Sequence, residues 1–419
     1  MIRSLSLVLL LVSLTACGGG GGGGGAPASG SATAEIHFPT PVTMTDATQI
    51  AVRGVASNAT AISVNGVAAT STDGFATWTA TVPLNFGLNT LFVSTTDAGG
   101  GVNTEAASAR VVQDPAALTT GSIGAGQSFT IIQDGYLDRA NNRLLVTDSS
   151  ESVLFALPLE AGNRIVLSSD ASIGGGAPAA LDAPHGLCFD TSGGNIFITD
   201  RGLDQVVRVD PTSGLRSVVV DGTTGSPLIG TAEDVEFVPA LDLLVWADRD
   251  PSGGSRLLSF DLGSGTRAVL SDSMSTGASL NGLDMVRFDP VGNRFLALAD
   301  DFTGTLFQID LTNGNRTTIA DQSTGTGPGA FEGPTGIGLD AANNRIVTHL
   351  RNVNRTVFVD LTTGNRTLIS EVGVRGNGPA FGGVQSTEYD DVKQVAYVMD
   401  TDAIYVVDAV TGERAIFSR

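Results

Sequence analysis

The sequence predicts an all-β protein in which a β-sandwich is followed by a six-bladed β-propeller. The stretch LFQIDLTNGNRT, starting at Leu306, returns fifty positions later as TVFVDLTTGNRT, starting at Thr356. An arginine two places after a glycine recurs about every fifty residues, a period found in propellers and other repeat folds, at Arg164, Arg216, Arg267, Arg316, Arg366 and Arg414. Each period holds four short β-type runs split by turn residues and no helical pattern, which is the makeup of a propeller blade.

The fifth copy shows the expected layout of one blade. Its four strands are predicted at Gly336 to Asp340, Arg345 to His349, Thr356 to Asp360 and Arg366 to Ser370. The repeated Asp, Asn and Gly lie in the hairpins between them, where Asn and Gly supply positive φ angles. We expect the recurrent arginine to shield a strand edge or to pair with an aspartate of a neighbouring blade. The ring is expected to close without an exchanged strand unless residues 128–132 pair across the seam.

The region 35–114 lacks this period and is predicted to be a separate domain. Ile50 and Val52 alternate with smaller or polar residues, and so do Trp78 and Val82, so each run has one face to bury. Asn65-Gly66 between two valines is a strong type I′ hairpin signal. About eighty residues with six or seven short strands indicate an immunoglobulin-like sandwich, in which Trp78 is expected in the core.

Three segments of this region also resemble a known family of modules. VRGVAS, SVNGVAA and the run from Gly74 to Thr96 are similar to the Ig-like modules of bacterial cell-surface and carbohydrate-active enzymes, notably the glucodextranase type. That resemblance implies a spacer role for the domain.

The start of the chain indicates export. One arginine and the apolar run Leu5 to Leu14 predict a signal peptide over residues 1–16, too short to span a bilayer as a helix. The following Leu14-Thr15-Ala16-Cys17 resembles the bacterial lipobox, which implies lipidation of Cys17. Residues 17–34 then form a Gly-rich flexible tether, and the propeller is expected over residues 115–419. Gly18 after the cysteine favours the outer membrane by resemblance to enterobacterial sorting.

The composition limits the classes of partner that the protein is expected to bind. The formal net charge of −20 argues against nucleic acid or an anionic membrane surface. With Cys17 lipidated, Cys188 is left without an intramolecular disulfide partner, and its apolar neighbours predict a buried thiol. We expect a monomer whose partners are the membrane, through the lipid, and a glycan, peptide or envelope protein.

The long Gly-rich links between blades all fall on one face, and loops on a rigid scaffold carry binding residues. The predicted ligand-binding residues at the channel mouth on this face are His185, Glu233, Asp234, Asn281, Asp284, Glu332, Glu388, Arg201, Arg249 and Arg351. Carboxylates suit Ca²⁺ or another hard cation, which is the one cofactor the sequence suggests. The candidate metal ligands are Glu233, Asp234, Asp284, Glu332 and Glu388. Alternatively, the aspartates that end the second strands only cap turns.

The last 300 residues resemble two related six-bladed groups. PTGIGLD at Pro334 is similar to NHL repeats, whereas FEGP at Phe331, LNGL at Leu280 and PHGLCFD at Pro184 look like motifs of the SMP-30/gluconolactonase group. The second resemblance implies a metal-dependent lactonase, with His185 and Glu332 as candidate catalytic residues. His185 stands where that family has its metal-binding aspartate, and the order of the motifs around the ring differs.

Two functions follow from these patterns. The first is a binding module that holds a partner on the looped face, because no nucleophile and base pair is recognisable. The second is a metal-dependent hydrolase or lactonase with a cation at the channel mouth and a carboxylate or His185 as base. A propeller hosts both kinds of function, so the sequence leaves the choice open.

Overall fold

A computed structural model describes residues 31–118, 121–170, 180–190, 193–223, 225–250, 253–300 and 304–419 of the chain. The predicted signal peptide, Cys17 and nearly all of the tether lie outside these residues and stay predictions. Helical structure in the described part consists of four short 3₁₀ turns: η1 Arg139–Asn141, η2 Pro239–Leu241, η3 Ala341–Asn343 and η4 Arg351–Val353. Over the same residues, no helix has the length and apolar character needed to cross a bilayer.

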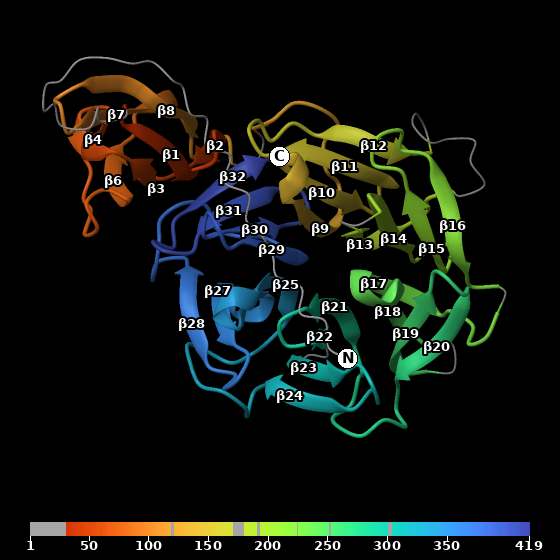
Figure 1. Ribbon diagram of the computed structural model, residues 1–419. Coiled ribbons are helices and arrows are strands. Elements are labelled where there is room, and N and C mark those ends of the chain that lie inside the picture. The colour runs from red at the N-terminus through yellow and green to blue at the C-terminus, as the bar shows by residue number, and fades with distance from the viewer. Residues whose placement is uncertain are drawn as a thin grey trace, which may run out of the picture.

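Six four-stranded antiparallel units stand around a central axis, which confirms the all-β propeller prediction (Figure 1). Blades one to three are β9 Ile132–Asp138, β10 Arg143–Asp148, β11 Val153–Pro158 and β12 Ile165–Ser169; β13 Pro184–Asp190, β14 Asn195–Asp200, β15 Gln205–Val209 and β16 Arg216–Asp221; and β17 Thr231–Val238, β18 Leu243–Arg249, β19 Ser255–Asp261 and β20 Thr266–Ser271. Blades four to six are β21 Leu283–Asp289, β22 Arg294–Ala299, β23 Thr305–Asp310 and β24 Arg316–Ala320; β25 Pro334–Asp340, β26 Arg345–Leu350, β27 Arg355–Asp360 and β28 Arg366–Glu371; and β29 Ser386–Asp390, β30 Val395–Met399, β31 Ile404–Asp408 and β32 Arg414–Ser418. The first strand of each blade lies innermost.

The repeated turn residues have the structural role that the sequence predicts. In blade five, Asn344 and Gly364 adopt φ angles of 49° and 70°, in the left-handed region that Asn and Gly tolerate best. The side chain of Asp360 accepts hydrogen bonds from the backbone N–H groups of Thr362 and Thr363, at 3.0 and 2.7 Å. The Asp, Asn and Gly residues that recur in each repeat therefore form the hairpins.

The recurrent outer-strand arginines are mostly buried, so the expectation that they shield exposed edges is wrong. Arg316 donates from Nε to the carbonyl of Ala278 and from Nη1 to Ser271 Oγ, both at 2.7 Å. Arg414 repeats the arrangement on Pro379 and Ser370. In both cases the guanidinium lies against carbonyls of the preceding inter-blade loop, and its donors satisfy groups that would otherwise be buried without partners. The predicted pairing with an aspartate holds at Arg216, which contacts Asp170.

The same device closes the ring. Arg164 of blade one donates to Ser418 Oγ at the end of blade six, at 3.0 Å, and the backbone N–H of Ile132 donates to Thr401 O at 2.9 Å. Every blade consists of four consecutive strands, so the described strands contain no exchange across the seam.

The N-terminal strands form two layers beside blade six. One layer is a three-stranded sheet, β1 Thr33–Phe38, β3 Gln49–Ser57 and β6 Thr77–Pro83. The other runs through β2 Val42–Thr45, β8 Val102–Gln113, β7 Gly87–Asp97, β4 Ala59–Val64 and β5 Val67–Ala68. Trp78, Val52, Val64 and Val93 from both layers share one core, and Trp78 is 2% exposed, which confirms its predicted burial.

This N-terminal unit is joined to the propeller by strand pairing and by charge. Met44 of β2 pairs with Ile416 of β32, which makes blade six and the second layer one continuous sheet. Arg53 contacts Asp408 at 2.8 Å, and the Asp408 side chain is fully buried. The outer edge of blade six is therefore covered rather than exposed.

Candidate functional site

A β-bulge near the start of the inner strand places polar side chains at the channel mouth. The pairing of β17 with β18 skips from Ala232 to Val235, so Glu233 and Asp234 lie in a bulge. The pairing of β13 with β14 skips in the same way after Pro184, which frees His185. Bulges redirect side chains near functional sites, and here they allow consecutive residues to face polar surroundings.

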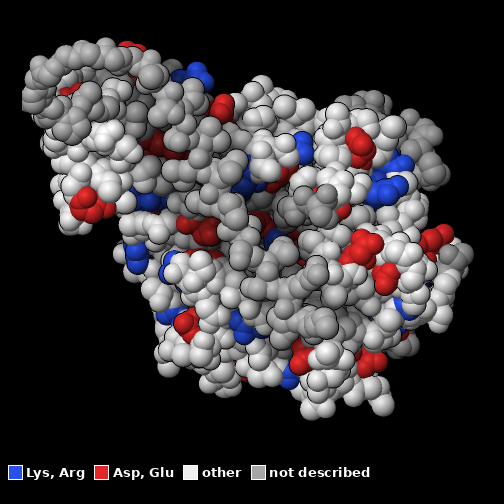
Figure 2. All heavy atoms as spheres, in the orientation of Figure 1, with Lys and Arg blue, Asp and Glu red and all other residues white. Residues whose placement is uncertain are grey.

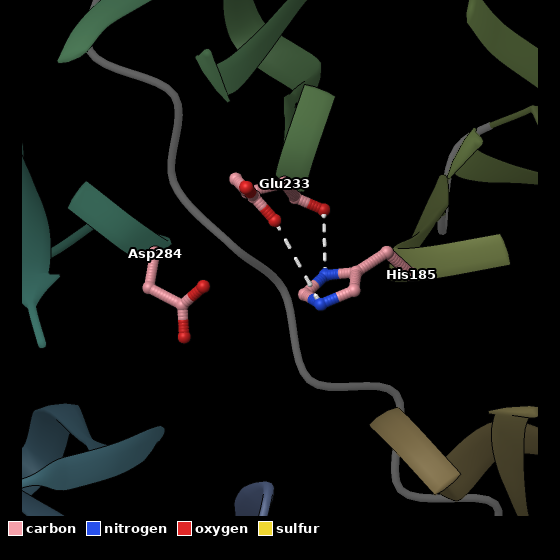
Figure 3. A group of neighbouring side chains, drawn as sticks. All are labelled: His185, Glu233 and Asp284. Carbon is pink, nitrogen blue, oxygen red and sulfur yellow. Dashed lines mark hydrogen bonds and ion pairs between the residues drawn. The ribbon is translucent and has the colours of Figure 1, made fainter. Parts of the chain in front are cut away.

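His185, Glu233 and Asp284 come from β13, β17 and β21 and face one space (Figure 3). One ligand atom from each lies within 4.8 Å of the others. The Nε2 atom of His185 is 3.8 Å from Glu233 Oε2, and its Nδ1 atom is 3.1 Å from the backbone carbonyl of Glu233. Because a carbonyl only accepts, Nδ1 carries the proton and Nε2 presents its lone pair.

Two arginines surround Glu233. Arg201 Nε lies 3.2 Å from Oε2, and Arg249 Nε lies 2.5 Å from Oε1. The Glu233 side chain is fully buried, whereas 34% of the Arg201 side chain and 51% of the Arg249 side chain are exposed. We call the group His185, Arg201, Glu233, Arg249 and Asp284 the looped mouth. Its guanidinium groups are the part that a ligand reaches first.

Burial changes the protonation of this group. It lowers the pKa of His185 to about 3, helped by Arg201, so the imidazole is neutral at physiological pH. It raises the pKa of Glu233 to about 7, although Arg201 and Arg249 oppose the rise, and burial also raises the pKa of Asp284. A base with a pKa near 3 is poorly matched to catalysis at neutral pH.

Buried hydroxyl groups hold the bulges in place. Thr199 donates from Oγ1 to the Glu233 carbonyl and accepts from the Gly186 N–H at 2.9 Å. A Cβ on Gly186 would lie 2.4 Å from the Cα of Asp234, so no larger residue fits there without displacing the bulge. Close packing against blade three therefore explains why the PHG segment has a glycine at position 186.

The structure distributes the predicted metal residues over three levels of the channel. Glu233 and Asp284 belong to the looped mouth. Asp234 lies deeper, where its Oδ2 accepts from the Val286 N–H at 2.8 Å. It ties blade three to blade four, and burial raises its pKa well above the usual range. Glu388 lies at the opposite end, paired with Arg287.

Other predicted residues lie outside the looped mouth. Among the described residues, the cluster of potential metal ligands does not include Glu332, and Asn281 is exposed. Arg351 pairs with Asp300. The second-strand aspartates cap turns, as the alternative interpretation held: Asp200 accepts from the backbone N–H groups of Asp182 and Gly202 at 2.9 and 3.0 Å.

Sequence reasoning named Cys188 and Glu388 but missed the other four residues of a ring that the repeat itself could have identified. The position two before the last residue of each inner strand holds Tyr136, Cys188, Glu236, Arg287, Gly338 and Glu388. Aligning the six copies by their inner strands places these residues on one level of the channel. Cys188 is buried as predicted, and burial raises the pKa of its thiol well above normal.

The looped mouth fits a metal only in part. One imidazole and two carboxylates are a donor set that transition metals accept. His185, Glu233 and Asp284 would hold the ion, which would supply a Lewis acid for a carbonyl. However, both oxygens of Glu233 already face guanidinium groups, and these would compete with a cation for that carboxylate.

The sequence matches no protein-family model and no curated protein. Solved structures are similar in fold. An auxiliary nutrient binding protein from Bacteroides thetaiotaomicron is 12% identical with a TM-score of 0.52, covering 92% of this chain and 97% of that chain. A protein of unknown function from the same organism is 12% identical with a TM-score of 0.53, covering 92% and 98%. A gluconolactonase from Xanthomonas campestris is 14% identical with a TM-score of 0.48, covering 70% and 88%.

The first two similarities extend over a share of this chain larger than the propeller alone accounts for. They therefore include N-terminal strands as well as blades. At these identities they concern the fold and carry no residue assignments.

Proposed function

We propose that this chain is a cell-envelope protein that binds a small hydroxyl-rich solute, a carbohydrate, at its looped mouth. The observation that carries the proposal is the alternation of partly exposed guanidiniums with carboxylates around Glu233. The contacts to Glu233 use Nε of Arg201 and Arg249, which leaves the terminal Nη donors of each guanidinium for hydroxyl groups. Asp284 supplies acceptor oxygens beside them.

The charge of the mouth also favours a polar solute. In Figure 2, acidic and basic side chains are interspersed over the face in view. A site in which arginines and carboxylates balance presents donors and acceptors without a large net field. The similarity to a solved auxiliary nutrient binding protein agrees with this function at the level of fold.

The remaining parts of the proposal concern the setting. Lipidation at Cys17 and the tether would hold the folded part at the outer membrane, and the N-terminal two-layer unit would be an Ig-like spacer. The junction through Met44 and Ile416 supports a fixed spacing between that unit and the propeller.

The test is calorimetric titration of the purified chain with a panel of neutral and acidic mono- and oligosaccharides. We expect Arg249→Ala to weaken the best ligand at least tenfold and Arg208→Ala, an exposed arginine on β15, to leave it unchanged. Binding that survives Arg249→Ala, or absence of binding across the panel, would reject the proposal.

A second function, metal-dependent hydrolysis, has one observation in its favour, the three-residue cluster His185, Glu233 and Asp284. Its test is metal analysis of the purified chain together with lactone hydrolysis. If Asp284→Asn loses both the bound metal and the hydrolytic activity, the result would favour metal-dependent hydrolysis over simple binding.

A further inference from the structure

The opposite end of the channel holds a pocket of about 520 Å³ among the turns that join first and second strands. Its walls include four aromatic residues from inner strands: Tyr136, Phe189, Phe288 and Tyr389. Its polar floor is Glu236, Arg287 and Glu388. We call these seven residues the hairpin mouth. It shares no residue with the looped mouth.

The floor carries two carboxylates for one guanidinium. Arg287 pairs through Nη2 with Glu388, and its Nε lies 3.5 Å from Glu236 Oε2. The side chains of Arg287, Glu236 and Glu388 are 16%, 12% and 8% exposed, so water compensates little of their charge. With both glutamates ionised, the floor has one uncompensated negative charge.

Neighbouring groups do not remove this imbalance. The rim residue Arg139 is engaged by Asp391 at 2.5 Å and lies 3.6 Å from Asp390. Behind the floor, Asp134 adds a further carboxyl group. Burial raises the pKa of Glu236 and of Glu388 to about 7, although Arg287 opposes both rises and Arg139 opposes that of Glu388. Glu388 adds to the rise at Glu236, and Asp134 adds to the rise at Glu388. A cation in the pocket would take the place of the proton that these groups otherwise hold.

The walls are suited to the same kind of ligand. The guanidinium of Arg287 lies 5.6 Å from the centroid of the Tyr136 ring, so this ring already faces one cation. The Tyr136 and Phe189 rings lie with centroids 6.4 Å apart. Aromatic faces carry negative potential and attract ammonium groups, more strongly where water is excluded.

We propose that the hairpin mouth binds a small organic cation, an alkylammonium compound, with its apolar groups against the aromatic walls and its charge toward Glu236 and Glu388. The site is independent of the carbohydrate function proposed for the looped mouth. The residual negative charge and the aromatic walls together favour a cation over a neutral sugar.

The test compares choline with its uncharged isostere 3,3-dimethylbutan-1-ol by calorimetric titration of the purified full chain at pH 8. We expect choline to bind at least tenfold more tightly than the alcohol. Glu236→Gln should weaken choline at least fivefold without changing the alcohol, and Tyr136→Ala should weaken both. The matched control is Glu105→Gln, at an exposed position of the N-terminal unit.

Equal affinity for the two compounds would overturn the proposal, because an apolar cleft alone would then explain binding. Absence of heat with either compound at millimolar concentration would overturn it as well, as would glucose binding more tightly than choline to this pocket. Circular dichroism checks that each variant folds. If Glu236→Gln does not fold, Glu388→Gln and the wild-type comparison of the two compounds decide.

Discussion

Strand β17 contributes a glutamate to each mouth of the channel, and the ratio of arginines to carboxylates around that glutamate differs between the two mouths. At the looped mouth Glu233 lies between two arginines, Arg201 and Arg249, and Asp284 brings the number of carboxylates there to two. Three residues later, Glu236 shares one arginine, Arg287, with a second glutamate. The number of oppositely charged side chains around each buried group, rather than the net charge of the protein, therefore determines which ligand charge each mouth favours.

The two mouths also differ in the solvent exposure of their charged side chains. Arg249 is half exposed, so solvent screens its contact with Glu233 and the arrangement tolerates change. Arg287 is mostly buried under aromatic walls, so its contacts are poorly screened. Stability should depend strongly on the hairpin mouth and weakly on the arginines of the looped mouth.

The largest expected effect is that of Arg287→Met. Removing the one cation leaves Glu236 and Glu388 buried without a counter-charge, which costs about 3–5 kcal/mol of unfolding free energy at pH 8. Arg249→Met at the other mouth should cost roughly 0–1 kcal/mol, because the Arg249 side chain is half exposed and Arg201 remains beside Glu233. Urea unfolding of the two variants measures both values, and equal losses would contradict the contrast between the mouths.

The second effect is a pH dependence that belongs to the hairpin mouth. Glu236 and Glu388 have folded-state pKa values of about 7 against an ordinary 4.5, so the folded state binds their protons more tightly. Their contribution is present below about pH 4.5 and is lost as the pH rises through 7, by on the order of 3 kcal/mol for each. Burial is the largest cause of both raised pKa values; Arg287 opposes both, Glu388 adds to the rise at Glu236, and Asp134 adds to the rise at Glu388 while Arg139 opposes it.

The measurement is urea unfolding at pH 5, 6 and 8 for the wild type and for the double variant Glu236→Gln, Glu388→Gln. Glu233 titrates in the same direction in both proteins, so the difference between them isolates the hairpin mouth. We expect the double variant to lose less stability between pH 5 and pH 8. Parallel curves would show that these glutamates titrate normally.

Much of the fold was predictable because turn residues and alternating apolar residues, which are close together in the sequence, determine its strands and hairpins. The first strand of blade five, predicted from Gly336 to Asp340, is observed over Pro334–Asp340, since the hairpin letters fix one end. The bulges were not predictable, because they arise from contacts between blades, such as that of Thr199 with the Glu233 carbonyl. Without them, the parity of the strand sends Glu233 and Asp234 to opposite faces.

The site residues divide along the same line. Glu233 and Asp284 were identified because they lie near the loops, but Glu388 was assigned to the wrong end of the channel, since its depth depends on the register of β29. Arg287 was missed because it lies within an apolar run, MVRFDP. The N-terminal unit gave a clearer pattern: Asn65 and Gly66 adopt the positive φ angles that the hairpin signal predicted.

The third prediction distinguishes a hydroxyl group that positions the looped mouth from one that only stabilises the fold. Thr199→Val removes the hydroxyl that satisfies the Glu233 carbonyl and the Gly186 N–H, which should cost about 1–3 kcal/mol. Thr348→Val removes a buried hydroxyl from the second strand of blade five, which donates to Thr335 O at 3.1 Å. Both variants should lose stability, but only Thr199→Val should weaken sugar binding at the looped mouth, measured by calorimetry. Equal effects on binding would mean that the bulge does not position the site.

The smallest effect tests whether partner counts govern ligand charge. Glu233→Gln leaves the two guanidiniums of Arg201 and Arg249 without their shared carboxylate, so at pH 8, where Glu233 is mostly ionised, the looped mouth becomes more positive by about one charge. We expect the affinity for glucuronate to rise about fivefold relative to that for glucose, which is about 1 kcal/mol. Glu236→Gln, in the same strand at the other mouth, should leave this ratio unchanged. The ratio is read by competition titration against the best ligand of the wild type. A ratio that does not move would mean that the guanidiniums turn toward Asp284 instead of the ligand, because a carboxylate half-buried beside them is the nearest alternative acceptor.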